Sequence, residues 1–161
     1  MNIFPLGPSG GAGGGFFDDV VDQLGGFGTG GFAEAASISR LVVHAGETVD
    51  NLQVTYQSQG STIGPIQHGA SNGGFVFPVF TLVLAAGERL KKIEGWLADF
   101  DGTLEVRGLR FTTTTGRQSG VLGATSGRVF LFEAPKGGEI FALWGRKGLF
   151  LDALGVFVRT P

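Results

Sequence analysis

The chain has 161 residues and carries 12 basic and 14 acidic side chains, which give a formal net charge of −2. No basic block is present to favour a nucleic-acid partner, and the lack of Cys excludes disulfides and thiolate chemistry. Glycine stands out at 30 residues, and its irregular placement between apolar segments is typical of turns in an all-β fold rather than of collagen.

The length predicts a single domain over residues 1–161. No apolar run reaches the length of a membrane-spanning helix, so no membrane insertion is expected. The first fifteen residues, MNIFPLGPSGGAGGG, have neither the basic start nor the long apolar stretch of a signal peptide. We therefore expect a protein that is cytoplasmic or is secreted by an unconventional route.

Eight short segments rich in Val, Ile, Leu, Phe and Thr predict β-strands. They are residues 38–44, 49–57, 75–84, 90–98, 104–113, 128–133, 138–145 and 150–158. Pro78 predicts an edge, a bulge or a break in the third of them. Only DDVVDQL at 18–24 hints at a helix, and the Gly-rich segments 7–15, 25–31, 69–74 and 116–127 predict loops.

Three segments align with one another without gaps. They are AGETVDNLQV at 45–54, AGERLKKIEG at 86–95 and KGLFLDALGV at 147–156. Each places Asp or Lys four residues after a glycine, at Asp50, Lys91 and Asp152. Three similar hairpin corners imply three similar sheets, and such sheets would pack face-inward about a pseudo-threefold axis as a β-prism.

Segments along nearly the whole chain resemble the jacalin-related lectins of the mannose-binding type. They are GGAGGGFFDD at 10–19, ISRLVVHAGETVDNLQVTY at 38–56, LAAGERLKKIEGWL at 84–97, LRFTTTTGRQSGVLG at 109–123 and IFALWGRKGLFLDALGVFV at 140–158. The closing WGRKGLFLDALGV is the most specific of these. The resemblance implies an all-β fold, a β-prism of three four-stranded antiparallel Greek-key sheets with pseudo-threefold symmetry. It also implies sugar binding at one end of the prism, with no metal, no cofactor and no catalytic residues.

In the family, the sugar pocket is formed by a GxxxD loop and a glycine of the N-terminal Gly-rich loop. These elements correspond here to residues 148–152 and to Gly14. The resemblance implies that Asp152 accepts from two neighbouring sugar hydroxyls, while the backbone N–H groups of Leu149 and Phe150 donate. Gly148 would permit the tight bend, and Gly14 the close approach of the second loop. The alternative is an Asp152 that only bonds its own turn.

Residues 46–50 form a second complete GxxxD motif, so a second sugar site is possible there. Its residues would be Glu47, Thr48 and Asp50, with Gly74 from the HGASNGG segment. The extra carboxylate of Glu47 either adds an acceptor or crowds the pocket. In the third segment, Lys91 has no acceptor atom, so that corner is expected to be structural.

These observations favour a lectin for mannose- or glucose-containing glycans and glycoproteins. Galactose-type members of the family are cut near the N-terminal glycine, whereas Gly14 lies inside a continuous chain. Single sites for a monosaccharide bind weakly, so a homo-oligomer, a dimer or higher, is expected to add avidity. The alternative is a β-prism module for protein interaction or self-association without sugar binding.

An enzyme is not expected. A glycosidase needs a pair of carboxylates, and the chain has many acidic residues from which a pair could come. We expect Asp18, Asp19, Asp22, Asp99 and Asp101 to be solvated turn residues in no catalytic arrangement. A metal site is not expected either, because His44 and His68 lie far apart in the sequence with no ligand cluster around them.

Overall fold

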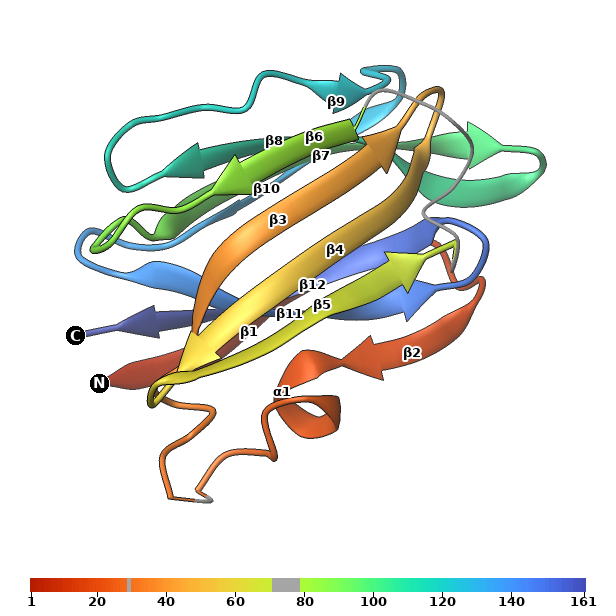
Figure 1. Cartoon of the computed structure of the whole chain (residues 1–161). Helices are drawn as coiled ribbons and strands as arrows, with labels where there is room; N and C mark the ends of the chain where they lie inside the picture. The colour runs from red at the N-terminus through yellow and green to blue at the C-terminus, as the bar shows by residue number, and fades with distance from the viewer. Residues whose placement is uncertain (29, 71–78) are drawn as a thin grey trace.

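Nearly all of the regular structure is β-strand (Figure 1). The structure is a computed structural model that describes residues 1–28, 30–70 and 79–161. Its elements are β1 (Asn2–Gly10), β2 (Gly15–Asp18), α1 (Asp19–Asp22), β3 (Ser37–Ala45), β4 (Val49–Ser58), β5 (Ser61–Gly69), β6 (Val79–Val83), β7 (Leu90–Phe100), β8 (Thr103–Thr113), β9 (Leu122–Gly123), β10 (Arg128–Glu133), β11 (Glu139–Lys147) and β12 (Leu151–Thr160). No helix in the described ranges is long and apolar enough to cross a membrane.

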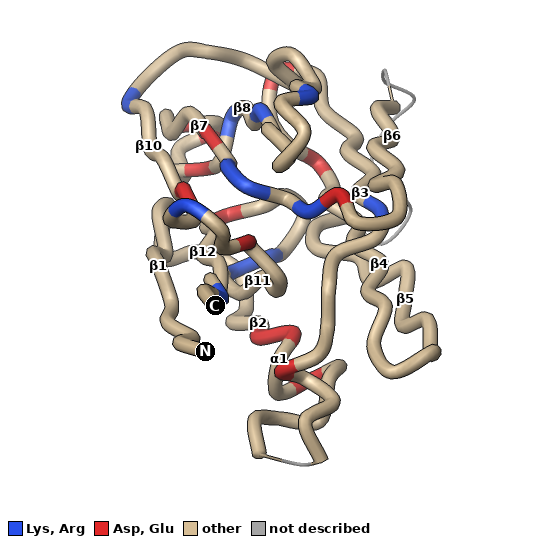
Figure 2. The backbone as a smooth tube through the Cα atoms, turned by 90° about the vertical axis from the view of Figure 1, so that its left-hand side faces the viewer, with Lys and Arg blue, Asp and Glu red and all other residues tan. Residues whose placement is uncertain are grey.

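The strands form three antiparallel groups of four, as the β-prism expectation requires. Their orders are β1-β12-β11-β2, β5-β4-β3-β6 and β10-β7-β8-β9. The first and third groups are joined through one paired position, Ile140 with Leu90, while the second is a separate sheet. In the view of Figure 2, β3 to β6 lie on one side and the labelled strands of the other two groups lie across from them. The predicted fold class is confirmed.

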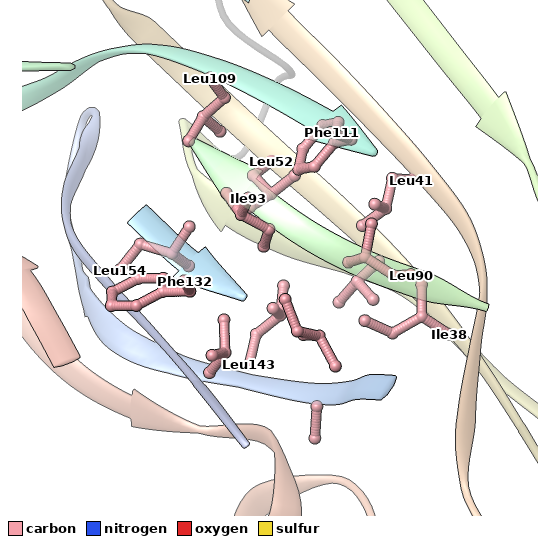
Figure 3. Close-up of a cluster of buried hydrophobic side chains, with 14 of the residues drawn as sticks. Ile38, Leu41, Leu52, Leu90, Ile93, Leu109, Phe111, Phe132, Leu143 and Leu154 are labelled. Atoms are coloured by element: carbon pink, nitrogen blue, oxygen red, sulfur yellow. The ribbon is translucent and has the colours of Figure 1, made fainter. Parts of the chain in front are cut away.

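The core lies between the three groups, and each group contributes to it. Figure 3 shows side chains from β3, β4, β7, β8, β10, β11 and β12 directed toward one another. Tyr56, Phe111 and Phe141 are its largest fully buried members. Burying a large apolar side chain stabilises a fold by about 1.5–3 kcal/mol, so the alternation of buried and exposed positions along these strands fixes their register.

Seven of the eight predicted strands are found within a few residues of their predicted bounds, and β10 matches its prediction at both ends. The remaining prediction, 75–84, is found as β6 over its described part, and Pro78 lies outside the described residues. Two long strands were not predicted: β1 contains Pro5 and Pro8, and β5 contains Gly64–Pro65. Both are edge strands, where a missing backbone N–H is tolerated.

The third predicted hairpin corner is wrong. Gly46 and Gly148 lie in the turns of the β3–β4 and β11–β12 hairpins, as the repeat predicts. Gly87 instead lies on the connection from β6 to β7, which leads from one group of strands to another. It borders a hollow with Ser37 at the start of β3, which is the opposite end of that strand from Gly46. The ungapped alignment matched similar letters at different places in the fold.

A buried polar cluster attaches the N-terminal segment to the rest of the prism. The Asp19 carboxylate accepts from the Tyr56 hydroxyl at 2.6 Å and lies 2.9 Å from His68 Nε2. The same hydroxyl accepts from the Leu143 N–H at 3.1 Å, and the His68 ring stacks on Phe17. The expectation of a solvated turn acid is therefore wrong for Asp19, which is 1% exposed. Asp18 caps α1 by accepting from two backbone N–H groups.

We predict that Tyr56→Phe lowers the free energy of unfolding by about 1–3 kcal/mol, because it leaves the buried Leu143 N–H without its acceptor and removes the Tyr56 hydrogen bond to the buried Asp19 carboxylate. Urea unfolding followed by circular dichroism measures this. Ser61→Ala, which removes an exposed hydroxyl from β5, is the control and should change stability little. Equal stability of Tyr56→Phe and the control would contradict a stabilising cluster.

Candidate functional site

The β11–β12 corner combines an exposed turn with an almost buried carboxylate. The Gly148 N–H donates to the Phe150 carbonyl at 3.0 Å, which closes the turn. Leu149 is 77% exposed at its tip, whereas Asp152, the second residue of β12, is only 5% exposed. The backbone N–H groups of Leu149 and Phe150 donate to no other described residue. The corner therefore offers two backbone donors beside a carboxylate acceptor.

These groups surround one cavity. It has a volume of about 280 Å³, and Asp152, Gly14, Gly148, Leu149 and Phe150 all line it. The structure thus brings together every residue predicted for the first site, although Gly14 and Gly148 are far apart in the sequence.

Two glycines of the N-terminal loop make room for the Asp152 carboxylate. A Cβ at Gly14 would lie 2.3 Å from the Lys147 carbonyl oxygen and 2.6 Å from Asp152 Oδ2. A Cβ at Gly13 would lie 2.7 Å from Asp152 Oδ1, so each carboxylate oxygen faces a bare glycine. Arg146 holds this loop in place by donating to the carbonyl oxygens of Gly13 and Gly14 at 3.0 and 2.8 Å. Gly13 was not singled out from the sequence, where it is one glycine in a run.

The same backbone contact recurs at the base of each hairpin and identifies the true third corner. In each case a residue that follows a positive-φ glycine donates its N–H to a carbonyl at 2.9 Å. The three bonds are Gly11 to Asp152, Ala70 to Asp50 and Ala124 to Arg107. Arg107 of β8 therefore takes the place of the two aspartates. Lys91 was expected in this position from the sequence, and that expectation is wrong.

The β7–β8 hairpin extends further at this end than the other two. The equivalent last pairs are His44–Asn51, Arg146–Ala153 and Trp96–Gly108. Six residues lie between the members of each of the first two pairs, and eleven lie between Trp96 and Gly108. The extension brings Phe100, Asp101, Thr103 and Glu105 into the wall of the Asp152 cavity. One signal in the sequence could have found this hairpin: Asp101–Gly102 between strand-like runs is a hairpin turn dipeptide, and both residues have positive φ.

An aromatic rim connects this extension to the first corner. The rings of Phe100 and Phe150 meet edge to face, with their centroids 5.3 Å apart. The Arg107 guanidinium lies over the Phe100 ring, and it also donates to the Glu47 carbonyl at 2.5 Å. Arg107 therefore contacts both the extension and the β3–β4 corner.

The β3–β4 corner has the same local turn as the first. The Gly46 N–H donates to the Thr48 carbonyl at 3.1 Å, and Asp50 is 4% exposed. Thr48 is buried, and its hydroxyl donates to the Val106 carbonyl, so only its backbone could face a ligand. Gly74, the predicted loop partner of this site, lies outside the described residues.

Burial and neighbouring charges perturb the acids of both corners. Burial raises the pKa of Asp152, while Glu105 and Arg146 lower it in part. Burial together with the Asp152 charge raises the pKa of Glu105 to about 8. Burial also raises the pKa of Asp50, partly offset by His44. No group of three His, Asp or Glu side chains in the described part of the chain is placed to hold a metal ion.

Comparison with known proteins gives one consistent family. The family model for the jacalin-like lectin domain matches residues 6–157. Jacalin-related lectin 3 of Arabidopsis thaliana is 30% identical over 163 residues, which is 96% of this chain and 23% of that protein. An agglutinin of Castanea crenata is 30% identical over 127 residues, 77% of this chain and 40% of its own length. The chain therefore spans well under half of these curated relatives.

Solved structures agree over the whole described fold. A mannose-binding jacalin-related lectin from Ananas comosus is 28% identical with a TM-score of 0.79, and the match covers 99% of both chains. Artocarpin in complex with mannotriose is 25% identical with a TM-score of 0.80, again over 99% of both chains. The β-prism resemblance seen in the sequence is confirmed.

We predict that Gly14→Ala costs about 1–3 kcal/mol more stability than Gly30→Ala, because only at Gly14 does the new Cβ meet backbone and the Asp152 carboxylate. The two glycines have φ of +67° and +71°, so backbone strain is matched, and nothing lies within 4 Å of a Cβ at Gly30. Urea unfolding of both variants gives the difference. Equal losses would mean that the loop does not pack against Asp152 as described.

Proposed function

The chain belongs to the family of jacalin-like lectin domains, and on that premise we propose that it binds mannose- or glucose-type glycans at the Asp152 corner. Carbohydrate binding in general is supported by the family and by its mannose-binding structural neighbours. The finer proposal concerns which residues bind and how. Binding requires neither a metal ion nor a catalytic step.

One observation carries the proposal: Asp152 lines the same cavity as Leu149 and Phe150, whose backbone N–H groups donate to no acceptor among the described residues. Neighbouring sugar hydroxyls are both donors and acceptors, so they match a carboxylate on one side and amides on the other. Hydrogen bonds to an ionised carboxylate are about twice as strong as neutral ones, which makes Asp152 the main polar anchor. The Phe150 ring at the rim provides an apolar surface for the C–H face of the sugar.

The Asp50 corner is proposed as a second, equivalent site. Its support is the repeated turn at Gly46 and the repeated bond from Ala70 to the Asp50 carbonyl. The Thr48 hydroxyl adds no further group, since it is already bonded to the Val106 carbonyl. The third corner, with Arg107 in the aspartate position, has no carboxylate acceptor at that position and is proposed to be structural.

We predict that Asp152→Asn weakens binding of methyl α-mannoside at its corner at least about a hundredfold, since two charge-assisted hydrogen bonds of about 1.5 kcal/mol each are lost. Isothermal titration calorimetry should give two sites for the wild type, one for Asp152→Asn or Asp50→Asn, and none for the double variant. Adding EDTA should change none of these values. Undiminished binding by a folded Asp152→Asn protein would place the sugar elsewhere.

We also propose self-association through an edge strand. Val129 and Leu131 on β10, and Val79 and Val83 on β6, are each more than half exposed, although both strands lie at sheet edges. Apolar side chains on an open edge favour pairing with another chain. Several copies would give weak single sites useful avidity for a multivalent glycan.

Sedimentation equilibrium is expected to give at least twice the mass of one chain, and Leu131→Lys or Val83→Lys should shift the species toward the monomer. The control is Thr62→Lys, which adds the same charge at an exposed position of β5. Leu104→Lys would not serve as a control, because Leu104 packs against the core. A wild-type protein that sediments as a monomer at all concentrations would rule out this proposal.

A further inference from the structure

Glu105 is a buried acid whose neighbours do not satisfy it as a carboxylate. It lies on β8 within the β7–β8 extension, it is 3% exposed, and it lines the Asp152 cavity. Its Oε2 atom is fully buried and receives no hydrogen bond from any described donor. Burial and then the Asp152 carboxyl, which lines the same cavity, raise the pKa of Glu105, and Asp152 when ionised is itself only an acceptor. A buried acceptor without a donor is costly, so the arrangement calls for a proton.

One proton shared between the two carboxyl groups satisfies both of them. Two adjacent ionised carboxylates repel each other, and burial strengthens that repulsion. If Glu105 holds the proton, its O–H donates to an Asp152 oxygen and Asp152 remains an anion. Arg146 favours this distribution because it interacts with Asp152 and lowers the pKa of that carboxyl. Burial and the Asp152 charge act on Glu105 in the opposite direction.

We propose that Glu105 is a positioning residue for sugar binding, whose protonated carboxyl donates to Asp152 and fixes the orientation in which that carboxylate meets the sugar. This inference rests on the proposed function of the Asp152 corner and adds a residue that acts through Asp152. Gly13 and Gly14 face one side of the carboxylate and leave it without side-chain support there. Glu105 supplies that support from the β7–β8 hairpin.

A pH limit on binding follows from this arrangement. The pKa of Glu105 is about 8, so the protonated form falls from most of the population at pH 7 to a small fraction at pH 9. If only that form binds well, the apparent affinity is about tenfold weaker at pH 9 than at pH 7. Binding also weakens in acid as Asp152 itself is protonated. Any site built on a carboxylate would lose affinity in acid, so only the alkaline loss tests the role of Glu105.

Other charged groups lie near Glu105 and Asp152, and their effect on binding must be distinguished from that of these two carboxyl groups. They are Arg146 from β11 and Asp101 at the tip of the β7–β8 hairpin, while Arg107 on β8 itself bonds the Glu47 and Asp99 carbonyls. Glu105→Gln leaves all of them in place. Its amide N–H₂ donates to Asp152 as the acid does, and it cannot ionise.

The test is calorimetric titration of methyl α-mannoside from pH 6 to pH 9.5 in the wild type, in Glu105→Gln and in Glu105→Leu. The wild type should lose about tenfold in affinity between pH 7 and pH 9. Glu105→Gln should bind like the wild type at pH 7 and keep its affinity at pH 9. Glu105→Leu should bind more weakly throughout, without the alkaline loss. An alkaline loss of the same size in Glu105→Gln, or none in the wild type, overturns the positioning role.

Thermal unfolding without sugar separates this inference from the proposed function. The folded-state pKa of Glu105 is raised above its unfolded value, so its stabilising contribution is fully present below about pH 4.5 and is lost as pH rises through 8. The Tm of the wild type should therefore fall relative to Glu105→Gln across that window. A Tm difference that does not change with pH overturns the carboxyl pair. If the pair is seen but no protein binds mannoside at any pH, the proposed function fails instead, and the positioning role with it.

Discussion

The Asp152 carboxylate occupies a space that exists only because the loop beside it has no side chains at Gly13 and Gly14. The two oxygens of the carboxylate face these glycines, so the N-terminal loop and the last hairpin must fold together before the cavity has its shape. Arg146 ties the loop to β11 through two carbonyls. The buried cluster of Asp19, Tyr56 and His68 attaches the segment that follows the loop to the second sheet. The candidate site therefore depends on packing across the whole prism.

Three-sheet symmetry explains why the chain has similar corners that do not offer the same groups. The same backbone bond forms at the base of all three hairpins, which means that the fold fixes the position of the corner residue. The side chain of the corner residue then determines which hydrogen bonds it can make. Asp152 and Asp50 are acceptors in buried surroundings, whereas Arg107 donates to the Glu47 carbonyl in the β3–β4 corner and to the Asp99 carbonyl in its own hairpin.

Local sequence patterns predicted the parts of this structure that are decided locally. The strand-forming composition of β4 and β10 and the GxxxD motif at 148–152 needed no knowledge of distant residues. The edge strands β1 and β5 were not predicted because both contain proline. Proline lacks a backbone N–H and is tolerated in a strand only at a sheet edge, and the order of strands in the sheet cannot be read from local sequence. Asp19 was expected in solvent since nothing near it in the sequence indicates that Tyr56 and His68 meet it.

The same reasoning explains the partial prediction of the candidate site. The five first-site residues were identified through family resemblance, but Glu105 was not, because its closeness to Asp152 follows from the extra length of one hairpin relative to another. The third corner was misplaced for a related reason. The segment around Gly87 has letters like those around Gly46 and Gly148, whereas Arg107 shares only the hydrogen-bonding position of Asp50 and Asp152.

A crystal structure of the protein soaked with methyl α-mannoside is the most direct measurement of the central claim. The account predicts a hexose in the 148–152 corner, with two neighbouring hydroxyls within hydrogen-bonding distance of the Asp152 carboxylate and the amides of Leu149 and Phe150 directed at the ring. A sugar bound at a different surface, or a corner that stays empty at saturating ligand, would contradict it.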